Sequence, residues 1–421
     1  MKQSLAIIGS GISGIAASYF LHNHYDVTLI EKENYIGGHT NTVEVEEEGK
    51  KIPIDTGFIV FNHVTYPMLL RFYRELGVPT KKSDMSFSVQ NDLEKLEFCG
   101  SGLNGLFLQR KNLFRIRYIK MLLEIDRFNT HAPKILEDPK YDHWELGKYM
   151  QEFNYGKDIL NNYLIPMSSA VWSTPPDLML SFPAKSLVRF FFNHGFLGLN
   201  TQHQWYTTEG GSWQYVKRFL TRFTGKVMTE APVRSVKRQE NGVMVNFQKG
   251  DSQFFNKIVM ATHGYQSYQM LEDPTKLETD LLVRYRYQPN TATLHTDDRD
   301  MPKIKKGWSS WNYKIINKNG KLEPFTIYWM NRLQGVSQKK NYFVTINDPD
   351  RIDPNKIIRR VDYEHPLFSV SASSGQRDLP KLNQEGNIYF CGAYHRFGFH
   401  EDGFCSGYEA AKSILGRDPW D

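Results

Sequence analysis

The sequence has little cysteine and no long apolar run. Only Cys99, Cys391 and Cys405 occur, an odd number without a CxxC pair. This excludes a disulfide framework and a cysteine-based zinc site, and it favours the reducing cytoplasm. No stretch approaches 18 uncharged apolar residues, so we expect no membrane-spanning helix. Glycines interrupt the first apolar run and no cleavage pattern follows it, so we expect no signal peptide.

Several kinds of chemistry also lack their motifs. No Gly-Lys pair precedes Ser or Thr, which excludes a Walker phosphate loop, and no GxSxG indicates a hydrolase. The 13 histidines show no HExxH spacing, so we expect no metal site. Lys plus Arg exceeds Asp plus Glu by only 52 to 46. That excess is too small for a nucleic-acid partner.

The chain does have length and many aromatic side chains. Its 421 residues suggest two or three structural units, and 40% hydrophobic residues are typical of a globular protein. Phe, Trp and Tyr make up 14% of the chain. Such a content indicates large aromatic cores or an apolar pocket.

Apolar runs near both ends predict strands and helices in alternation. Residues 5–8 and 27–30 have the pattern of strands, and the Ala/Ile-rich stretch between them, up to His22, that of a helix. Residues 388–391 and 406–415 repeat the strand and the helix near the C-terminal end. This alternation is typical of an α/β fold.

A different pattern separates these ends. Residues 227–236, 243–247 and 257–261 predict a small meander of strands, with Asn241-Gly242 as a turn signal. Two blocks rich in aromatic and long side chains remain. We therefore predict one domain from residues 1–85, 205–270 and 375–421, and a second from residues 86–204 and 271–374.

The strongest local signal lies between the first strand and the first helix, in Gly9-Ser10-Gly11-Ile12-Ser13-Gly14. The first glycine permits a tight turn, the second lets a pyrophosphate approach the backbone, and the third lets the helix pack on the strand. Glu31, followed by Lys32, closes the second strand, where a carboxylate accepts hydrogen bonds from an adenosine ribose. The pattern predicts a dinucleotide site, with a structural glycine turn as the alternative.

The identity of the dinucleotide stays open at this point. Glu31 disfavours the 2′-phosphate of NADP by repulsion, but the spacing alone fits NAD and FAD equally. Two further glycine segments follow, Gly37-Gly38-His39-Thr40 and Gly57-Phe58-Ile59. Taken alone, each is also typical of a turn.

Taken in order, these segments resemble the flavin-containing amine oxidase superfamily. The resemblance implies bound FAD and an α/β fold, with a discontinuous Rossmann-like FAD-binding domain and an inserted α+β substrate domain. It spans both ends and the middle of the chain. The segments that carry it are Gly9 to Gly14, Glu31, Gly37-Gly38, Gly210-Gly211, Val233 and Gly392 to Gly407.

A narrower resemblance covers most of the chain. The sequence is similar to a bacterial group of FAD-dependent oxidoreductases often encoded beside cyclopropane-fatty-acid synthases, and to a domain fused to the plant synthases. This implies a synthase of that type as partner and a lipid as substrate. The segments that carry it are residues 170–175, 182–184, 189–195 and 398–403.

The superfamily resemblance also implies contacts for individual residues. The loop from Gly9 to Gly14 holds the pyrophosphate, and Glu31 with Lys32 holds the adenosine ribose. Gly38, His39 and Thr40 follow the ribityl chain, although the superfamily usually has arginine in place of His39. A helix N-terminus at the pyrimidine end of the flavin stabilises negative charge there. The remaining implied contacts are Gly57, Phe58 and Ile59 at the ring, Val233 at the adenine, and Gly392, Asp402, Gly403 and Phe404 around the start of the last helix.

His400 and Glu401 are the candidate catalytic residues. Together with Asp402 they precede the predicted last helix, so they can reach the flavin edge as a proton acceptor or as electrostatic support. The alternative is that Asp402 caps the helix while His400 and Glu401 fix the loop. Many amine oxidases of the superfamily have a lysine near the flavin N5, and Lys305 or Lys306 matches it by position alone.

Residues 106–128 carry six cations against only Glu124 and Asp126, interleaved with apolar residues. This pattern is typical of a basic amphipathic helix on an anionic membrane, and also of a solvated helix that covers the substrate domain. The predicted location is therefore the cytoplasm, with peripheral attachment to the inner face of the membrane as an open alternative. The cations are Arg110, Lys111, Arg115, Arg117, Lys120 and Arg127.

These observations predict an FAD-dependent oxidoreductase that takes a hydride from a C–H bond of an apolar substrate, a fatty acyl chain or another lipid. The alternatives are an amine oxidase that produces an aldehyde and a non-redox accessory protein to a lipid-modifying synthase. An aromatic cage at the flavin favours the amine, and an apolar tunnel that opens near residues 106–128 favours the lipid. The aromatic candidates for such a channel, or for the core, are Trp172, Trp205, Tyr206 and Trp213.

Overall fold

The fold is built on a five-stranded parallel sheet, described by a computed structural model that covers residues 2–198, 201–318 and 321–421. The sheet has the order β10-β2-β1-β14-β20, and all its strands run parallel. Strands buried on both faces are continuously apolar, which is why β1 and β14 lack alternation. The strands are β1 (Ser4–Ile8), β2 (Asp26–Ile30), β10 (Lys226–Met228), β14 (Lys257–Met260) and β20 (Ile388–Phe390).

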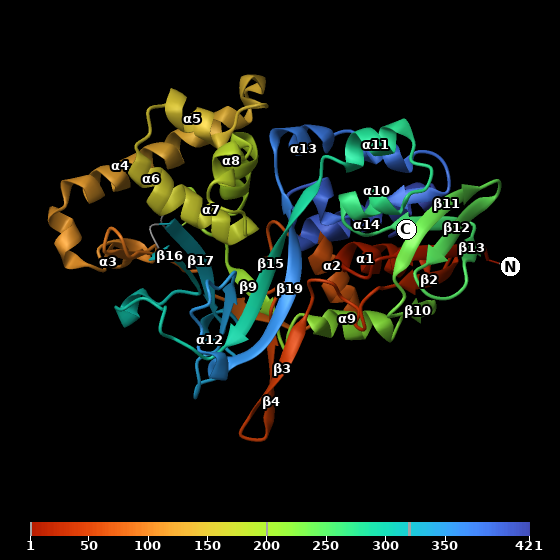
Figure 1. The fold of residues 1–421 in the computed structure, drawn as a ribbon, viewed down its shortest axis with the longest axis horizontal. Helices are drawn as coiled ribbons and strands as arrows, with labels where there is room; N and C mark the ends of the chain where they lie inside the picture. The colour runs from red at the N-terminus through yellow and green to blue at the C-terminus, as the bar shows by residue number, and fades with distance from the viewer. Residues whose placement is uncertain (1, 199–200, 319–320) are drawn as a thin grey trace.

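Two helices from opposite ends of the chain pack against each other beside this sheet. Helix α1 (Ile12–Leu21) follows β1, and α14 (His400–Leu415) follows β20. A Cβ added to Gly407 would lie 2.3 Å from the Ser13 carbonyl oxygen, so only glycine allows this close approach. Figure 1 shows the two helices next to β2 in the right half of the molecule.

Three predictions for these elements are wrong. Residues 257–261 do not belong to the meander, because β14 is apolar on both faces and lies inside the parallel sheet. The predicted strand 227–236 divides into β10, in that sheet, and β11 (Val233–Gln239), which pairs with β12 (Gly242–Phe247) and β13 (Gln253–Phe255). The last helix begins at His400 and not at residue 406, because its polar first turn hides the apolar periodicity.

A seven-stranded mixed sheet forms the second layer, with the order β19-β15-β18-β17-β16-β7-β8. The long strands β15 and β19 pair along ten positions and run down the middle of the molecule in Figure 1, between its two halves. The strands are β7 (Phe87–Asn91), β8 (Leu96–Cys99), β15 (Arg286–His295), β16 (Trp311–Lys318), β17 (Lys321–Trp329), β18 (Phe343–Ile346) and β19 (Ile357–Leu367).

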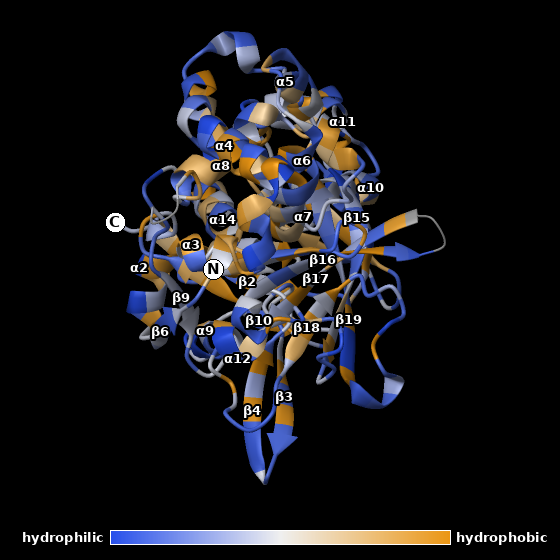
Figure 2. Cartoon of the chain, turned by 90° about the vertical axis from the view of Figure 1, so that its left-hand side faces the viewer, coloured by the Kyte–Doolittle hydropathy of each residue, from blue (hydrophilic) through white to orange (hydrophobic). Residues whose placement is uncertain are grey.

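Helices from residues 102–193 gather beside this sheet, at the upper left of Figure 1. In Figure 2, α4 and α8 carry apolar and polar stretches together, as expected of helices with one face against a core. In the described part of the chain, no helix is both long and apolar enough to cross a membrane. The helices are α3 (Gly102–Leu106), α4 (Ile116–His131), α5 (Leu146–Glu152), α6 (Lys157–Ile159), α7 (Ile165–Trp172) and α8 (Ala184–Asn193).

Smaller elements connect the layers. Strands β3 (Thr42–Glu47) and β4 (Lys50–Asp55) form a hairpin that projects from the lower edge of the molecule in Figure 1. A short sheet has the order β5-β9-β6. The other elements are β5 (Val60–Asn62), β6 (Thr80–Ser83), β9 (Trp205–Thr208), α2 (Pro67–Leu76), α9 (Trp213–Leu220), α10 (Gly264–Met270), α11 (Lys276–Leu282), α12 (Met330–Leu333) and α13 (Val370–Gly375).

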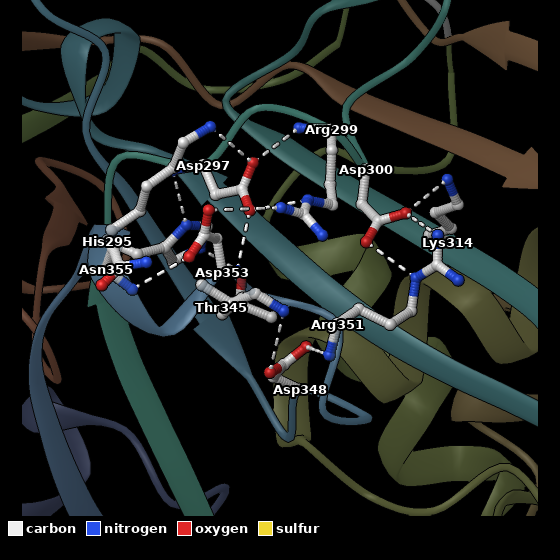
Figure 3. A network of polar contacts seen from close by, with 12 residues as sticks. His295, Asp297, Arg299, Asp300, Lys314, Thr345, Asp348, Arg351, Asp353 and Asn355 are labelled. Carbon is white, nitrogen blue, oxygen red and sulfur yellow. Dashed lines mark hydrogen bonds and ion pairs between the residues drawn. The ribbon is translucent and has the colours of Figure 1, made fainter.

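A polar network ties strands of the seven-stranded sheet together (Figure 3). Asp300 accepts hydrogen bonds from the Arg351 guanidinium at 2.7 and 2.8 Å, and the Lys314 ammonium lies 2.9 Å away. Burial raises the pKa of Asp300, but these two cations outweigh it and hold the pKa below its usual range. Because Lys314 is almost fully buried, the network is structural support for the sheet.

Candidate active site

A cavity of about 1090 Å³ lies where the carboxyl ends of β1 and β14 meet β15 and β19. In open α/β sheets, ligands bind at this end of the strands. Most of the residues predicted to contact the cofactor line this one cavity. They are Gly9, Ser10, Gly11, Ile12, Ser13, Glu31, Lys32, Gly38, His39, Gly57, Phe58, Ile59, Val233 and Gly392, and His400 joins them.

The glycine loop offers backbone donors to an anion. A Cβ on Gly14 would lie 1.9 Å from the Gly9 carbonyl oxygen, whereas a Cβ on Gly11 would meet nothing within 4 Å. The N-terminus of α1 has no side-chain cap, so its first N–H groups and its positive dipole end are available. This open cradle fits the pyrophosphate of a dinucleotide.

Glu31 lines the part of the cavity where the adenosine ribose is predicted to bind. Its Oε2 accepts hydrogen bonds from the Ser10 N–H at 3.0 Å and the Ser10 hydroxyl at 2.6 Å, and its Oε1 accepts from the Glu33 N–H. A carboxylate has about four acceptor positions, so some remain for ribose hydroxyls. Lys32 lies exposed beside it and pairs with Glu33.

His39 brings a neutral ring to the cavity. Burial, reinforced by His365 and His263, holds its pKa well below the usual range. Its ring stacks on Tyr363 with centroids 4.7 Å apart. In these surroundings the imidazole is neutral, so it makes no ion pair.

His400 lies in a stack at the start of α14. Its ring covers Phe58 with centroids 3.6 Å apart and an interplanar angle of 7°. Its Nε2 lies 2.9 Å from the Thr40 hydroxyl and 3.3 Å from that of Tyr215. Burial lowers its pKa to about 3, so the ring is neutral and a weak proton acceptor.

Glu401 and Asp402 accept hydrogen bonds from backbone N–H groups at or near helix N-termini. The Glu401 carboxylate accepts hydrogen bonds from the N–H groups of Met68 and Leu69, in the first turn of α2. Asp402 accepts from the N–H groups of Phe397 and Phe399, just before α14. Burial raises the pKa of both carboxyls, that of Asp402 to about 7. These contacts agree with the capping alternative, and a catalytic role for Glu401 stays a prediction.

Several predicted residues lie outside the cavity wall. Gly403 and Phe404 lie inside the first turns of α14, which begins at His400, and the Gly403 N–H donates to the Phe399 carbonyl. Phe404 instead packs on Phe20 and Phe72 in the core. The N-terminus of α14 still faces the cavity through Phe399 and His400. The residues outside the wall are Gly14, Thr40, Glu401, Asp402, Gly403 and Phe404.

His365, on β19, is a cavity residue that sequence reasoning missed. Its Nδ1 lies 3.0 Å from the Asn290 side-chain amide, whose oxygen accepts from Asn347. The amide therefore donates to Nδ1, and Nε2 carries the proton. Burial lowers the pKa of His365 to about 4. No local motif indicates this residue, since the contact joins β15 to β19 across 75 positions.

Another part of the cavity wall is apolar and aromatic. Trp172 and Trp205 line it, whereas Tyr206, Trp213, Lys305 and Lys306 do not, and no residue of 106–128 does. Among the described residues, Lys32 is the only lysine that lines the cavity, and it follows Glu31. The apolar wall consists of Met85, Val171, Trp172, Phe190, Phe196, Trp205, Trp311, Tyr328 and Ile346.

Comparison with known proteins identifies the family. The sequence matches the model for flavin containing amine oxidoreductases over residues 12–299. The chain belongs to this family. The resemblance to the flavin-containing amine oxidase superfamily is thus confirmed, and with it the α/β fold, the FAD cofactor and the activity of an FAD-dependent oxidoreductase. No curated protein sequence matches the chain.

Several solved structures share the fold of this chain over nearly the whole length. Cyclohexylamine oxidase from Brevibacterium oxydans has a TM-score of 0.68 and 16% identity, with 99% of each chain covered. A putrescine oxidase variant has 0.69 and 14%, with 99% of each chain covered. A fatty acid isomerase from P. acnes has 0.68 and 12%, with 98% of each chain covered. At these identities the likeness shows the fold alone.

Proposed function

We propose that this oxidoreductase takes a hydride from a C–H bond of an apolar substrate, a long acyl chain or another lipid. The observation that supports it is the apolar wall of the cavity, in which four aromatic rings with indole or phenol groups lie among aliphatic and phenyl side chains. The charged lining residues, outside this wall, are Glu31, Lys32, Glu33, Arg234, Asp362 and Glu364. An unbranched hydrocarbon needs such a wall and no counter-ion. A charged amine would leave water for a site without an acidic partner.

Bound FAD would supply the hydride acceptor, and the residues of this chain would bind it and form its surroundings. The glycine loop and Glu31 hold the adenosine diphosphate part. His400 and Phe58 form a stacked wall, and His365 presents an N–H to the cavity. The proton that leaves with desaturation of the substrate then passes to a base or to solvent, since neutral His365 and His400 are weak acceptors at neutral pH.

The carboxylates of the cavity wall already have partners. Glu364 accepts hydrogen bonds from the Tyr265 hydroxyl at 2.7 and 2.9 Å and lies 3.1 Å from His263. Asp362 accepts from the Thr291 hydroxyl. These contacts hold the pKa of Glu364 at about 2, so it is ionised, but its neighbours His263 and Lys32 place it beside the ribose-binding residues and not in the apolar wall.

Amine oxidation is the second candidate. Trp311 and Tyr328 line the cavity with ring centroids 4.8 Å apart, and a pair of aromatic rings can hold an amine. Two of the structures with a similar fold are amine oxidases by name. The fatty acid isomerase with the same fold is compatible with the lipid instead.

Filling the apolar wall tests the proposal. Val171→Trp should slow anaerobic flavin reduction by long-chain acyl compounds at least about tenfold, since it removes space from the wall. Leu180→Trp, at a half-exposed site outside the cavity, is the control. Flavin content and melting temperature establish that each variant folds. Unchanged reduction by acyl compounds in a folded Val171→Trp protein would contradict the proposal.

A further inference from the structure

One corner of the molecule leaves apolar side chains uncovered. Phe114 is 89% exposed and Ile116 is 86% exposed, with Leu103 at 69% and Leu123 at 66%. They come from α3, the 3₁₀ helix Arg110–Phe114 and the first half of α4. These segments form the left-hand end of the molecule in Figure 1. Exposed apolar residues scattered singly are ordinary, but a group of this kind indicates an interaction surface. We call these residues, with Leu113, the apolar corner.

The segment that carries the apolar corner also carries six cations. The structure divides these basic residues of 106–128 into two groups by their partners. Arg117 pairs with Glu94 and Asp158, so it joins α4 to neighbouring segments. Arg127 donates to the backbone of Phe153 and Asn154. These two arginines have structural roles.

The other four cations are free to meet an anion. Arg110 and Arg115 hydrogen-bond only to asparagine side chains, Asn104 and Asn112. In the described chain, no carboxylate pairs with any of the four. They are Arg110, Lys111, Arg115 and Lys120.

The apolar side chains and the cations occupy the same short segment. The prediction of one continuous helix over 106–128 is wrong, because the chain turns at Arg115 and α4 begins at Ile116. Phe114 and Ile116 flank this turn at Arg115, and both are exposed. Tyr118, Met121 and Phe128 turn the opposite face of α4 into the core.

We infer that the apolar corner binds the surface of an anionic lipid bilayer. Phe114, Ile116 and Leu103 enter the boundary between headgroups and acyl chains, and the four cations meet anionic headgroups. Charge complementarity favours a bilayer over a protein partner, since the core of a protein interface is depleted of charged residues. The inference does not depend on the substrate proposed above.

Co-sedimentation of the full-length FAD-loaded protein with vesicles tests it. We expect binding to vesicles of phosphatidylcholine with phosphatidylglycerol, and much weaker binding to phosphatidylcholine alone. Lys111→Glu with Lys120→Glu should weaken binding to the anionic vesicles at least about tenfold. Phe114→Ser with Ile116→Ser should do the same. Because all four positions are exposed, flavin content should stay at the wild-type value.

Matched variants at the opposite end of the molecule provide the controls. Lys226→Glu with Lys249→Glu changes the net charge equally, and Phe254→Ser removes an exposed aromatic ring from β13. Both should bind vesicles as the wild type does. Absence of wild-type binding to anionic vesicles, or equal loss in the control variants, would overturn the inference. The wild-type protein could instead associate with itself and not bind vesicles. If Phe114→Ser with Ile116→Ser abolished that self-association, the apolar corner would bind a second copy of the chain and the inference would be overturned.

Discussion

Gly11 differs from the other glycines of its loop in what surrounds it. A Cβ there would enter open space, whereas one on Gly14 would strike backbone. The backbone at Gly11 has a φ of −65°, which any residue adopts. The glycine is therefore required by the ligand and not by the fold.

Gly11→Val should keep the fold and lose the cofactor. Loss of the backbone hydrogen bonds to a charged phosphate, about 3 kcal/mol, raises the Kd for FAD on the order of 100-fold. Absorbance of bound flavin and a thermal melt of the FAD-free protein measure the two effects. Gly11→Ala should be intermediate, and Gly14→Val should fail to fold. Wild-type flavin retention by Gly11→Val would contradict the glycine-loop assignment.

The sequence predicts the pyrophosphate-binding and ribose-binding residues well, because these residues lie close together along the chain. Gly9 to Gly14 and Glu31 lie in consecutive elements, so their spacing alone indicates the contact. His365 and Asn290 meet only because β15 and β19 pair, and no spacing within either strand reveals that. The sequence also does not predict that the His39 ring is neutral, since the charge of a histidine depends on its burial.

Glu401 joins two helices at the scale of elements. It lies in the first turn of α14, and its carboxylate accepts hydrogen bonds from N–H groups in the first turn of α2. Polar residues at a helix start carry no apolar periodicity, which explains why the predicted start of the last helix was six residues late. Strand β14 was assigned to the meander for a related reason, because an apolar run does not state which sheet it enters.

Glu401→Gln should destabilise the protein by about 1–2 kcal/mol, since α2 loses an acceptor and a negative charge at its N-terminus. Urea unfolding of the variant measures this cost. Glu409→Gln, on an exposed position of the same helix, should be neutral. A Glu401→Gln protein of wild-type stability with much slower flavin reduction would instead give Glu401 a catalytic role.

Buried histidines make the whole molecule sensitive to acid. Burial lowers the pKa of His194, His295, His365 and His395 to about 4 and that of His400 to about 3. The unfolded chain binds these protons below about pH 6.5 and the folded chain does not, so stability falls as the pH falls. Asp55 and Asp402 act in the opposite direction, because burial raises their pKa values to about 6 and about 7.

With His39, at least six buried histidines bind a proton only in the unfolded chain, whereas burial makes Asp55, Asp402 and Glu401 bind protons more readily in the folded chain. The unfolded state therefore binds more protons, and between pH 6 and pH 5 the free energy of unfolding should fall by about 1.4 kcal/mol for each extra proton. Urea unfolding at pH 7, 6 and 5 measures the slope. His295→Gln, far from the cavity, should reduce the slope by about one proton. A stability that does not change over this range would mean that these rings are not buried as neutral groups.

At the scale of the whole molecule, each of the two large sheets is built from segments that lie far apart in the sequence. Strands of the parallel sheet come from residues 4–30, 226–260 and 388–390, and those of the seven-stranded sheet from 87–99 and 286–367. The aromatic excess of the composition is divided between the core clusters and the wall of the cavity. Composition alone does not separate these two uses, since both need large apolar side chains.

The central claim is an FAD-dependent oxidoreductase with an apolar substrate. The most direct measurement is anaerobic incubation of the FAD-loaded protein with phospholipids and free fatty acids on one side and a panel of primary amines on the other. Loss of the visible absorbance of oxidised flavin reports hydride transfer. The account predicts bleaching by a lipid and none by the amines, and bleaching by amines alone would contradict it.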